Sequence, residues 1–214
     1  MSVKPDPGGL SARILWGNLS PFALLPGAAL LFVASDRLSH ALLTLAALVW
    51  VYGLSALAVS TASRFLPERG RTAVFAFTAS FAASLYLLPV SLLFPLAALQ
   101  VFFAVALVPV LCAGSGVLDR AAATDPASAL RLAATEALVA GSLVVILSLI
   151  REPLGFRSLS LPGGSGGILM FYPFGENSPL YLRLLSGVPG ALLLLAYALG
   201  AYRHFRSKHR RGDD

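Results

Sequence analysis

Charge is scarce in this sequence of 214 residues, since only 12% of the residues are Asp, Glu, Lys or Arg. Soluble domains carry roughly 25% charged residues, and a soluble fold of this length needs them to cover its surface. Hydrophobic residues make up 57% of the chain, and the mean hydropathy is +0.79. The composition therefore excludes an ordinary cytosolic enzyme, a disordered tail and a nucleic-acid-binding domain. It indicates an integral membrane protein.

Cysteine is nearly absent as well. Cys112 is the one cysteine in the chain, which excludes an intrachain disulfide. A lone thiol in an apolar helix is either a small core residue or a metal ligand that needs further thiolates from elsewhere. The three histidines show no metal-ligand spacing with a carboxylate, and no glycine loop of the phosphate-binding kind is present. We predict no catalytic residue, and Cys112 is the one candidate metal ligand.

Charged residues separate the apolar runs that predict membrane-spanning helices. The charge-free run of residues 72–118 is long enough for two helices of about 20 residues each. Pro89 and Pro95 are expected to divide it, because proline interrupts the helical hydrogen-bond ladder. The sequence therefore predicts an all-α polytopic membrane protein with six transmembrane helices. Their approximate positions are 14–35, 38–63, two helices within 72–118, 132–150 and 184–202.

Lysine and arginine counts orient the predicted spans. With the N-terminus inside, twelve of the sixteen basic residues fall on the cytoplasmic side and four fall outside, as the positive-inside rule requires. Residues 1–214 then form a single membrane domain, with 1–13 as a cytoplasmic N-terminal segment and 203–214 as a basic cytoplasmic tail. The basic tail holds five of the sixteen basic residues and is interpreted as a cytoplasmic anchor beside the lipid bilayer. The net charge of +6 is explained in this way, and no nucleic-acid partner is expected.

Breaks in the first and fourth predicted helices suggest an internal repeat. Pro26 and Gly27 interrupt the first helix, and Pro109 lies in the fourth, while an offset of 83 residues relates Asp36-Arg37 to Asp119-Arg120. Two halves of three helices each have opposite orientations, and paired breaks then mark a site near the membrane midplane. The alternative is that these prolines have no such role, since proline is common in transmembrane helices.

Ionisable residues at membrane depth are the remaining candidates. Glu136, near the start of the fifth span, is either a proton or cation ligand on an ion path or an interfacial carboxylate paired with Arg131. Arg151 and Glu152 follow that span directly, and they either cap the helix end or pair with a partner subunit. The apolar stretch 168–174 is too short to cross a bilayer. It is expected at the outer interface or against a partner.

Several short motifs follow one another in a fixed order. Leu15–Ser20 precedes Leu25–Gly27 in the first half, and Ile150–Gly155 and Val188–Ala191 lie in the second. Together they resemble the integral membrane subunits of the Rnf/Nqr family (RnfE/NqrD type) over nearly the whole chain, and Glu136 falls where that family has an acid. The positions that match family motifs are Pro26, Gly27, Ala29, Pro109, Ser115, Arg120, Arg151, Glu152, Gly155, Pro189 and Gly190.

The resemblance implies six transmembrane helices in two inverted halves. It also implies an oppositely oriented paralogue, with which each subunit shares two cysteines around a [2Fe-2S] cluster. Here Ala29 stands at the first cysteine position, and the second is Ser115 or Cys112, depending on the register. At least one of the two ligands is missing, and such clusters need four. We therefore expect no cofactor in this chain alone and no standard shared cluster.

The resemblance finally implies a subunit of a complex that couples ferredoxin:NAD or NADH:quinone electron transfer to sodium or proton pumping. We expect a structural or ion-path role in that complex, in a bacterial cytoplasmic (inner) membrane with both termini in the cytoplasm. Enzymatic activity is expected at most for the complex, not for the chain alone. The alternatives are a transporter or channel-like subunit that reuses the fold without electron transfer, and a membrane scaffold that assembles partners.

Overall fold

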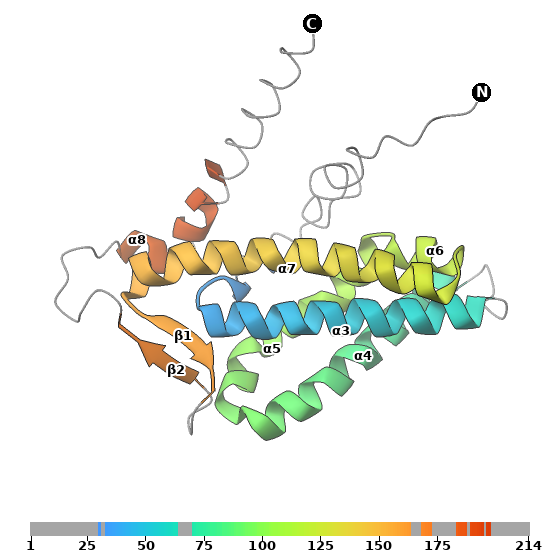
Figure 1. The fold of residues 1–214 in the computed structure, drawn as a ribbon, viewed down its shortest axis with the longest axis horizontal. Helices are drawn as coiled ribbons and strands as arrows, with labels where there is room; N and C mark the ends of the chain where they lie inside the picture. The colour runs from blue at the N-terminus through green and yellow to red at the C-terminus, as the bar shows by residue number, and fades with distance from the viewer. Residues whose placement is uncertain are drawn as a thin grey trace, which may run out of the picture.

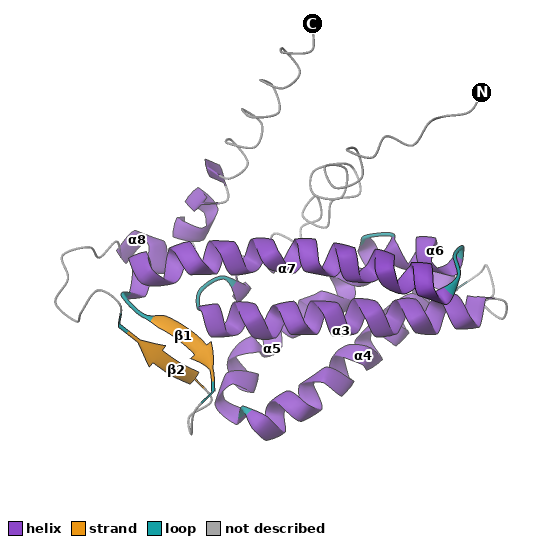
Figure 2. Ribbon diagram, viewed as in Figure 1, coloured by secondary structure: helices purple, strands orange, loops and turns teal. Residues whose placement is uncertain are grey.

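The computed structural model describes residues 30, 33–63, 70–163, 168–172, 183–187, 189–194 and 196–197. Most of this part is helical, and a small antiparallel hairpin is the exception (Figures 1 and 2). The elements are α3 (Leu38–Ala62), α4 (Arg71–Leu93), α5 (Pro95–Gly114), α6 (Val117–Ala122), α7 (Pro126–Phe156), β1 (Leu159–Pro162), β2 (Ile168–Phe171) and α8 (Arg183–Ser186).

Four of these helices, α3, α4, α5 and α7, are long and apolar enough to cross a membrane. The prediction of a helical membrane protein is thus confirmed at this level, whereas six transmembrane helices are not confirmed. The first predicted span lies almost wholly outside the described residues. Of the sixth, the structure describes the short helix α8 and a helical stretch over residues 189–194.

The helix boundaries follow the charges and prolines closely, with two differences. Pro89 lies inside α4 and does not end it, whereas Pro95 occupies the first turn of α5 after a break at Phe94. That position suits proline, because its missing amide would have no partner in the first turn anyway. The helix expected at 132–150 is α7, which extends beyond both predicted ends to Pro126–Phe156.

The N-terminus of α7 shows why it begins where it does. Asp125 precedes the helix, and its carboxylate accepts a hydrogen bond of 3.1 Å from the amide of Ser128. This contact holds the pKa of Asp125 below its ordinary value. Pro126 follows at the first helical position, so the usual signals of a helix start coincide.

The antiparallel pair of α3 and α7 forms the centre of the structure, and α4 and α5 cover α3 on one side (Figure 1). The face of α7 that packs inward is made mostly of small residues. Small side chains let helix backbones approach closely in a membrane, where packing rather than water exclusion drives association. The buried small residues of α7 are Ala129, Ala133, Ala137, Ala140, Gly141, Ser148 and Gly155.

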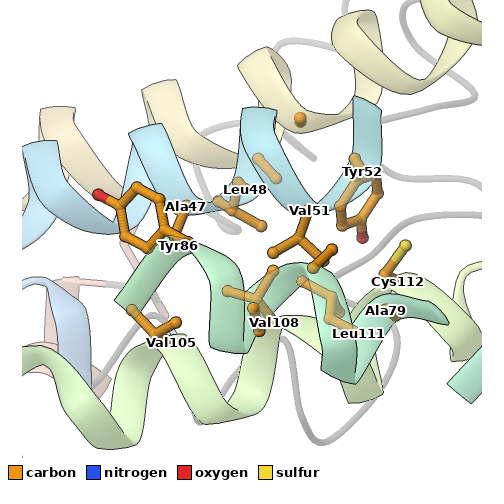
Figure 3. Close-up of a cluster of buried hydrophobic side chains, with 14 of the residues drawn as sticks. Ala47, Leu48, Val51, Tyr52, Ala79, Tyr86, Val105, Val108, Leu111 and Cys112 are labelled. Atoms are coloured by element: carbon orange, nitrogen blue, oxygen red, sulfur yellow. The ribbon is translucent and has the colours of Figure 1, made fainter. Parts of the chain in front are cut away.

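The hydrophobic core extends over α3 to α7, and Figure 3 shows the part where α3, α4 and α5 meet. Leu48 and Val51 of α3 are fully buried against side chains of α5 that include Val108. Tyr86 of α4 adds a polar tie, because its hydroxyl donates a 2.7 Å hydrogen bond to the carbonyl oxygen of Leu43. Buried tyrosine usually needs such a partner, so this bond fixes α4 against α3.

The outward faces of α4 and α5 carry large apolar side chains in the open. The side chain of Leu92 is 83% exposed and that of Leu99 is 75% exposed. Soluble monomers rarely expose apolar surface on this scale, whereas a bilayer favours it. These faces therefore fit lipid contact. The large exposed residues on the two helices are Phe77, Phe81, Leu88, Leu92, Leu93, Leu96, Leu99, Phe102, Phe103 and Val110.

The break predicted in the fourth span lies later than Pro109. Pro109 is buried within α5, which continues to Gly114. The chain then turns at Gly116, whose φ of 71° lies in the left-handed region that glycine adopts without strain. The short helix α6 follows. The corresponding break at Pro26 and Gly27 lies outside the described residues, so the inverted repeat stays a prediction.

The hairpin is a feature that an all-α expectation missed. Strand β2 pairs antiparallel with β1, with Phe171 opposite Leu159 and Ile168 opposite Pro162. The apolar stretch expected at an interface therefore begins as a strand. Met170 and Phe171 are exposed on it.

The close approach of α3 and α7 at Gly141 is testable. A side-chain carbon at Gly141 would overlap the end of the Leu45 side chain and lie 3.1 Å from its Cγ. We expect Gly141→Ala to cost about 1–3 kcal/mol through overpacking. Thermal unfolding in detergent measures the loss. The double variant Gly141→Ala, Leu45→Ala should recover part of it, and no recovery would contradict direct contact as the cause.

Candidate functional site

Two buried polar clusters lie between α3 and α7, at different levels along the helix pair. The first, called the Glu136 cluster, consists of Tyr52, Cys112, Ser115, Arg120 and Glu136. The second, called the cap cluster, surrounds the N-terminus of α3 and consists of Asp36, Ser39, His40, Arg151, Glu152 and Ser160. Both clusters contain residues singled out from the sequence, but their bonding differs.

Glu136 is buried in the middle of the protein, with only 1% of its side chain exposed. Its Oε1 lies 2.5 Å from Nη2 of Arg120, which reaches it from α6. Arg131, considered from the sequence as its partner, is instead exposed on α7. The pairing of Glu136 with Arg131 is therefore wrong, because α6 supplies its counter-ion through Arg120.

Arg120 also binds the turn that precedes its own helix. Its Nε donates a 3.2 Å hydrogen bond to the carbonyl oxygen of Gly116, and its Nη2 lies 3.5 Å from that of Ser115. These carbonyls follow the C-terminal end of α5, where a cation is favoured by the helix dipole. The Arg120 side chain is 32% exposed. Arg120 therefore connects buried Glu136 to the protein surface.

Tyr52 is a member of this cluster that sequence reasoning missed. It is almost fully buried on α3, and within the described residues its hydroxyl makes no hydrogen bond of regular geometry, although the side chain of Ser115 lies close enough to interact with it. The side chains of Tyr52 and Cys112 point toward one another (Figure 3), and Glu136 and Arg120 lie within electrostatic range of the hydroxyl. A polar tyrosine in the middle of an apolar span was the available signal.

The residues present do not fit the iron–sulfur cluster that the resemblance implies. The thiol of Cys112 is fully buried within this chain's own core, whereas a cluster shared between subunits needs thiolates at their interface. The hydroxyl of Ser115 donates to the carbonyl oxygen of Cys112 at 3.0 Å. No group of three or more possible metal-ligating side chains occurs among the described residues. Ala29 lies outside them.

The cap cluster completes the N-terminus of α3. Arg37 precedes the helix and its side chain provides no cap. Instead, Oε2 of Glu152 on α7 accepts a 2.7 Å bond from the amide of Leu38, and the hydroxyl of Ser160 on β1 accepts one of 3.2 Å from that of Ser39. A carboxylate is also favoured there by the helix dipole. Two distant segments thus satisfy amides that α3 cannot pair itself.

His40 extends this cluster toward α5. Its Nδ1 lies 2.8 Å from the carboxylate of Asp36, and its Nε2 lies 2.8 Å from Oε1 of Gln100 on α5. Burial alone would raise the pKa of Asp36. The hydrogen bond and charge of His40, the amide of Arg37 and the charge of Arg151 outweigh it and hold that pKa below its ordinary value. Asp36 therefore stays ionised and tethers His40.

Arg151 joins the end of α7 to α8. Its guanidinium donates to the carbonyl oxygens of Leu185, Ser186 and Gly187 at 2.8 to 3.1 Å, and to the hydroxyl of Ser35 at 3.0 Å. Those three carbonyls lie at the C-terminal end of α8, where the last carbonyls of a helix lack a partner within it, and the carbonyl of Gly187 also accepts a 3.4 Å hydrogen bond from the amide of Ala191. Arg151 thus caps a different helix from its own.

Gly155 allows that contact. A side-chain carbon at Gly155 would lie 2.9 Å from the backbone nitrogen of Ser186, a distance that real side chains do not reach. The backbone of α8 therefore packs directly on α7. Arg151, Glu152 and Gly155 all act between segments of this chain. None caps the end of α7, which continues to Phe156.

The other motif positions are placed as follows. Pro189 is exposed and Gly190 buried at the start of the helical residues 189–194, next to the carbonyls that Arg151 binds. Pro26, Gly27 and Ala29 lie outside the described residues. The structure therefore brings together the motif residues of the second half in two groups, one around Glu136 and one around Arg151.

Comparisons of this chain with protein-family models and with curated proteins give no match. The Rnf/Nqr resemblance therefore stays a prediction, based on the motifs themselves.

The role of Arg151 is testable by a conservative change. Arg151→Lys keeps the charge but loses the planar fork that binds several carbonyls at once. We expect a loss of at least about 1.5–3 kcal/mol, the value of one charge-assisted hydrogen bond. Thermal unfolding in detergent measures it. Arg131→Lys, on the exposed face of the same helix, is the matched control and should leave stability unchanged. Equal effects of the two substitutions would contradict this role.

Proposed function

We propose that this chain is a membrane subunit of an Rnf/Nqr-like ion-translocating electron-transport complex. It resides in the bacterial cytoplasmic membrane with both termini in the cytoplasm. Its role is to hold the membrane part together and to provide part of an ion path through Glu136. It carries no cluster of its own.

The buried Glu136 carboxylate is the observation that carries this proposal. An ionisable side chain inside a membrane-spanning helix is costly and marks ion or proton pathways in membrane proteins. Glu136 is enclosed by α3, α5 and α6, and its counter-ion Arg120 is partly exposed. A group that is buried but connected to the surface through one side chain suits a path for a small cation.

The motif residues Arg151, Glu152 and Gly155 support the structural half of the proposal. Each connects α7 to another segment of the chain. These three residues belong to the most specific motif of the Rnf/Nqr resemblance, and their contacts explain that motif through the packing of this fold. The broad apolar faces of α4 and α5 offer surface for the oppositely oriented paralogue that such a complex contains, as well as for lipid.

A transporter or channel-like subunit without electron transfer is the second candidate. The observation that favours it is the turn at Ser115 and Gly116, which separates α5 from α6 directly beside Arg120 and Glu136. Broken helices next to a buried charge are typical of transporter binding sites. The two candidates share Glu136 and differ in their partners.

Purification from native membranes separates the two candidates. We expect the full chain to co-purify in mild detergent with flavin-binding and iron–sulfur-binding subunits, because its role needs a complex. Metal analysis should find no iron that depends on Cys112, so Cys112→Ser should leave the iron content of the complex unchanged. A chain that runs alone, or together with a solute-binding protein, would favour the transporter instead.

The ion-path role of Glu136 is tested in the purified complex. Glu136→Gln should remove most of the cation pumping into proteoliposomes while electron transfer continues, because an amide neither releases a proton nor attracts a cation as a carboxylate does. Asp119→Asn is the matched control, since Asp119 lies on α6 beside Arg120 but is 65% exposed. Unchanged pumping in Glu136→Gln would rule out this path.

A further inference from the structure

We propose that Glu136 and Tyr52 form a proton-binding site, which Arg120 closes for as long as the Glu136 carboxyl group is ionised. This deepens the proposed ion-path role of Glu136 and rests on it. It names the ion as a proton, adds Tyr52 to the site and assigns Arg120 a movement.

The first step is the bonding of the buried oxygens. Apart from the ion pair with Arg120, neither carboxylate oxygen of Glu136 has a hydrogen-bond partner among the described residues, and the Tyr52 hydroxyl has none either. Buried polar groups in native proteins are normally paired, and the exceptions need a reason such as a bound water, an ion or a functional role. Once Arg120 is counted as the partner of Oε1, two buried oxygens of this cluster stay unpaired, Oε2 of Glu136 and the Tyr52 hydroxyl, and they indicate a site that binds something.

The second step is that Glu136 depends on Arg120 for a partner more than Arg120 depends on Glu136. Arg120 has other acceptors at the turn after α5, namely the carbonyl oxygens of Gly116 and Ser115, and it is partly exposed. Glu136 is buried, and among the described residues Arg120 is its one counter-charge. If the pair opens, Arg120 keeps the contact of its Nε with the Gly116 carbonyl while the end of its guanidinium turns toward the surface. Glu136 has no comparable alternative as an anion.

The third step is the set of groups that face Glu136. They are Tyr52 from α3, Cys112 from α5, and Arg120 from α6. A metal cation would enter beside the guanidinium of Arg120, which repels it. A proton instead neutralises the carboxylate, breaks the ion pair and leaves a carboxylic acid whose O–H donates to the Tyr52 hydroxyl. The charge balance of the cluster therefore favours a proton.

The buried thiol of Cys112 reports the opening of the site. In the full chain purified in detergent, we expect Glu136→Gln, which imitates the protonated acid, to react with a small maleimide about tenfold faster than the wild type. A tenfold change in the population of the open site corresponds to about 1.4 kcal/mol. Both proteins are labelled over the same range of pH, which separates opening of the site from easier ionisation of the thiol beside a neutral Gln. Unchanged labelling would overturn the proposal.

Glu152→Gln is the matched control, because Glu152 is equally buried on the same helix but belongs to the cap cluster. It should leave Cys112 labelling at the wild-type rate. Equal acceleration in both variants would mean that loss of any buried charge loosens the bundle, and the proposal would be wrong.

Infrared spectroscopy tests the site without relying on the folding of a variant. On lowering the pH, the wild type should gain the carbonyl band of a protonated, hydrogen-bonded carboxylic acid. The band should be absent from Glu136→Gln, retained in Glu152→Gln, and shifted to that of a non-bonded acid in Tyr52→Phe. Absence of the band in the wild type overturns the proton site, and an unshifted band in Tyr52→Phe removes Tyr52 from it.

Neither the labelling nor the infrared measurement needs a partner subunit, so failure of co-purification and failure of this site are distinguishable.

Discussion

The N-terminus of α3 begins inside the protein, and the first amides of a helix have no acceptor within that helix. In an apolar environment each unpaired amide costs roughly 2–7 kcal/mol. The position at which α3 begins therefore depends on Glu152 and Ser160, which accept hydrogen bonds from its first amides. This requirement explains why α7 continues past the end of its apolar run. Its last turns carry Glu152 to the start of α3, and they also bring Arg151 and Gly155 against α8.

The two polar clusters meet the cost of burial in opposite ways. Around α3, most of the described carboxylates and hydroxyls have defined partners: Oε2 of Glu152 with Leu38, Ser160 with Ser39, and Asp36 with His40. Oε1 of Glu152 is the exception in this cluster, since it has no hydrogen-bond partner among the described residues. Such a network fixes a single arrangement of helices. The Glu136 cluster leaves oxygens unpaired next to a charge that has other acceptors available. A buried group with few bonds and one movable partner can change its state, so function is better sought there than in the cap cluster.

The sequence predicts the apolar helices well because charge and proline act locally. The helix expected from residue 38 to 63 is observed as Leu38–Ala62, and Pro95 begins α5. Contacts between segments that are far apart in the sequence cannot be predicted from such local signals. Periodicity shows neither that Arg151 reaches α8 nor that Arg120, rather than Arg131, pairs with Glu136. The hairpin was missed for the same reason, because each of its two short strands is held in place by hydrogen bonds with the other.

These contacts also change what the family resemblance means. Arg151, Glu152 and Gly155 are each explained by the packing of this chain alone, so a match at these positions is evidence of a shared fold more than of a shared reaction. The redox content of the resemblance lies in its cysteine positions. There the chain has Ala29 and either Ser115 or a fully enclosed Cys112. The proposed role in such a complex therefore rests on packing residues and not on thiolates, and the chemistry proposed at membrane depth depends on Glu136 and the groups that face it.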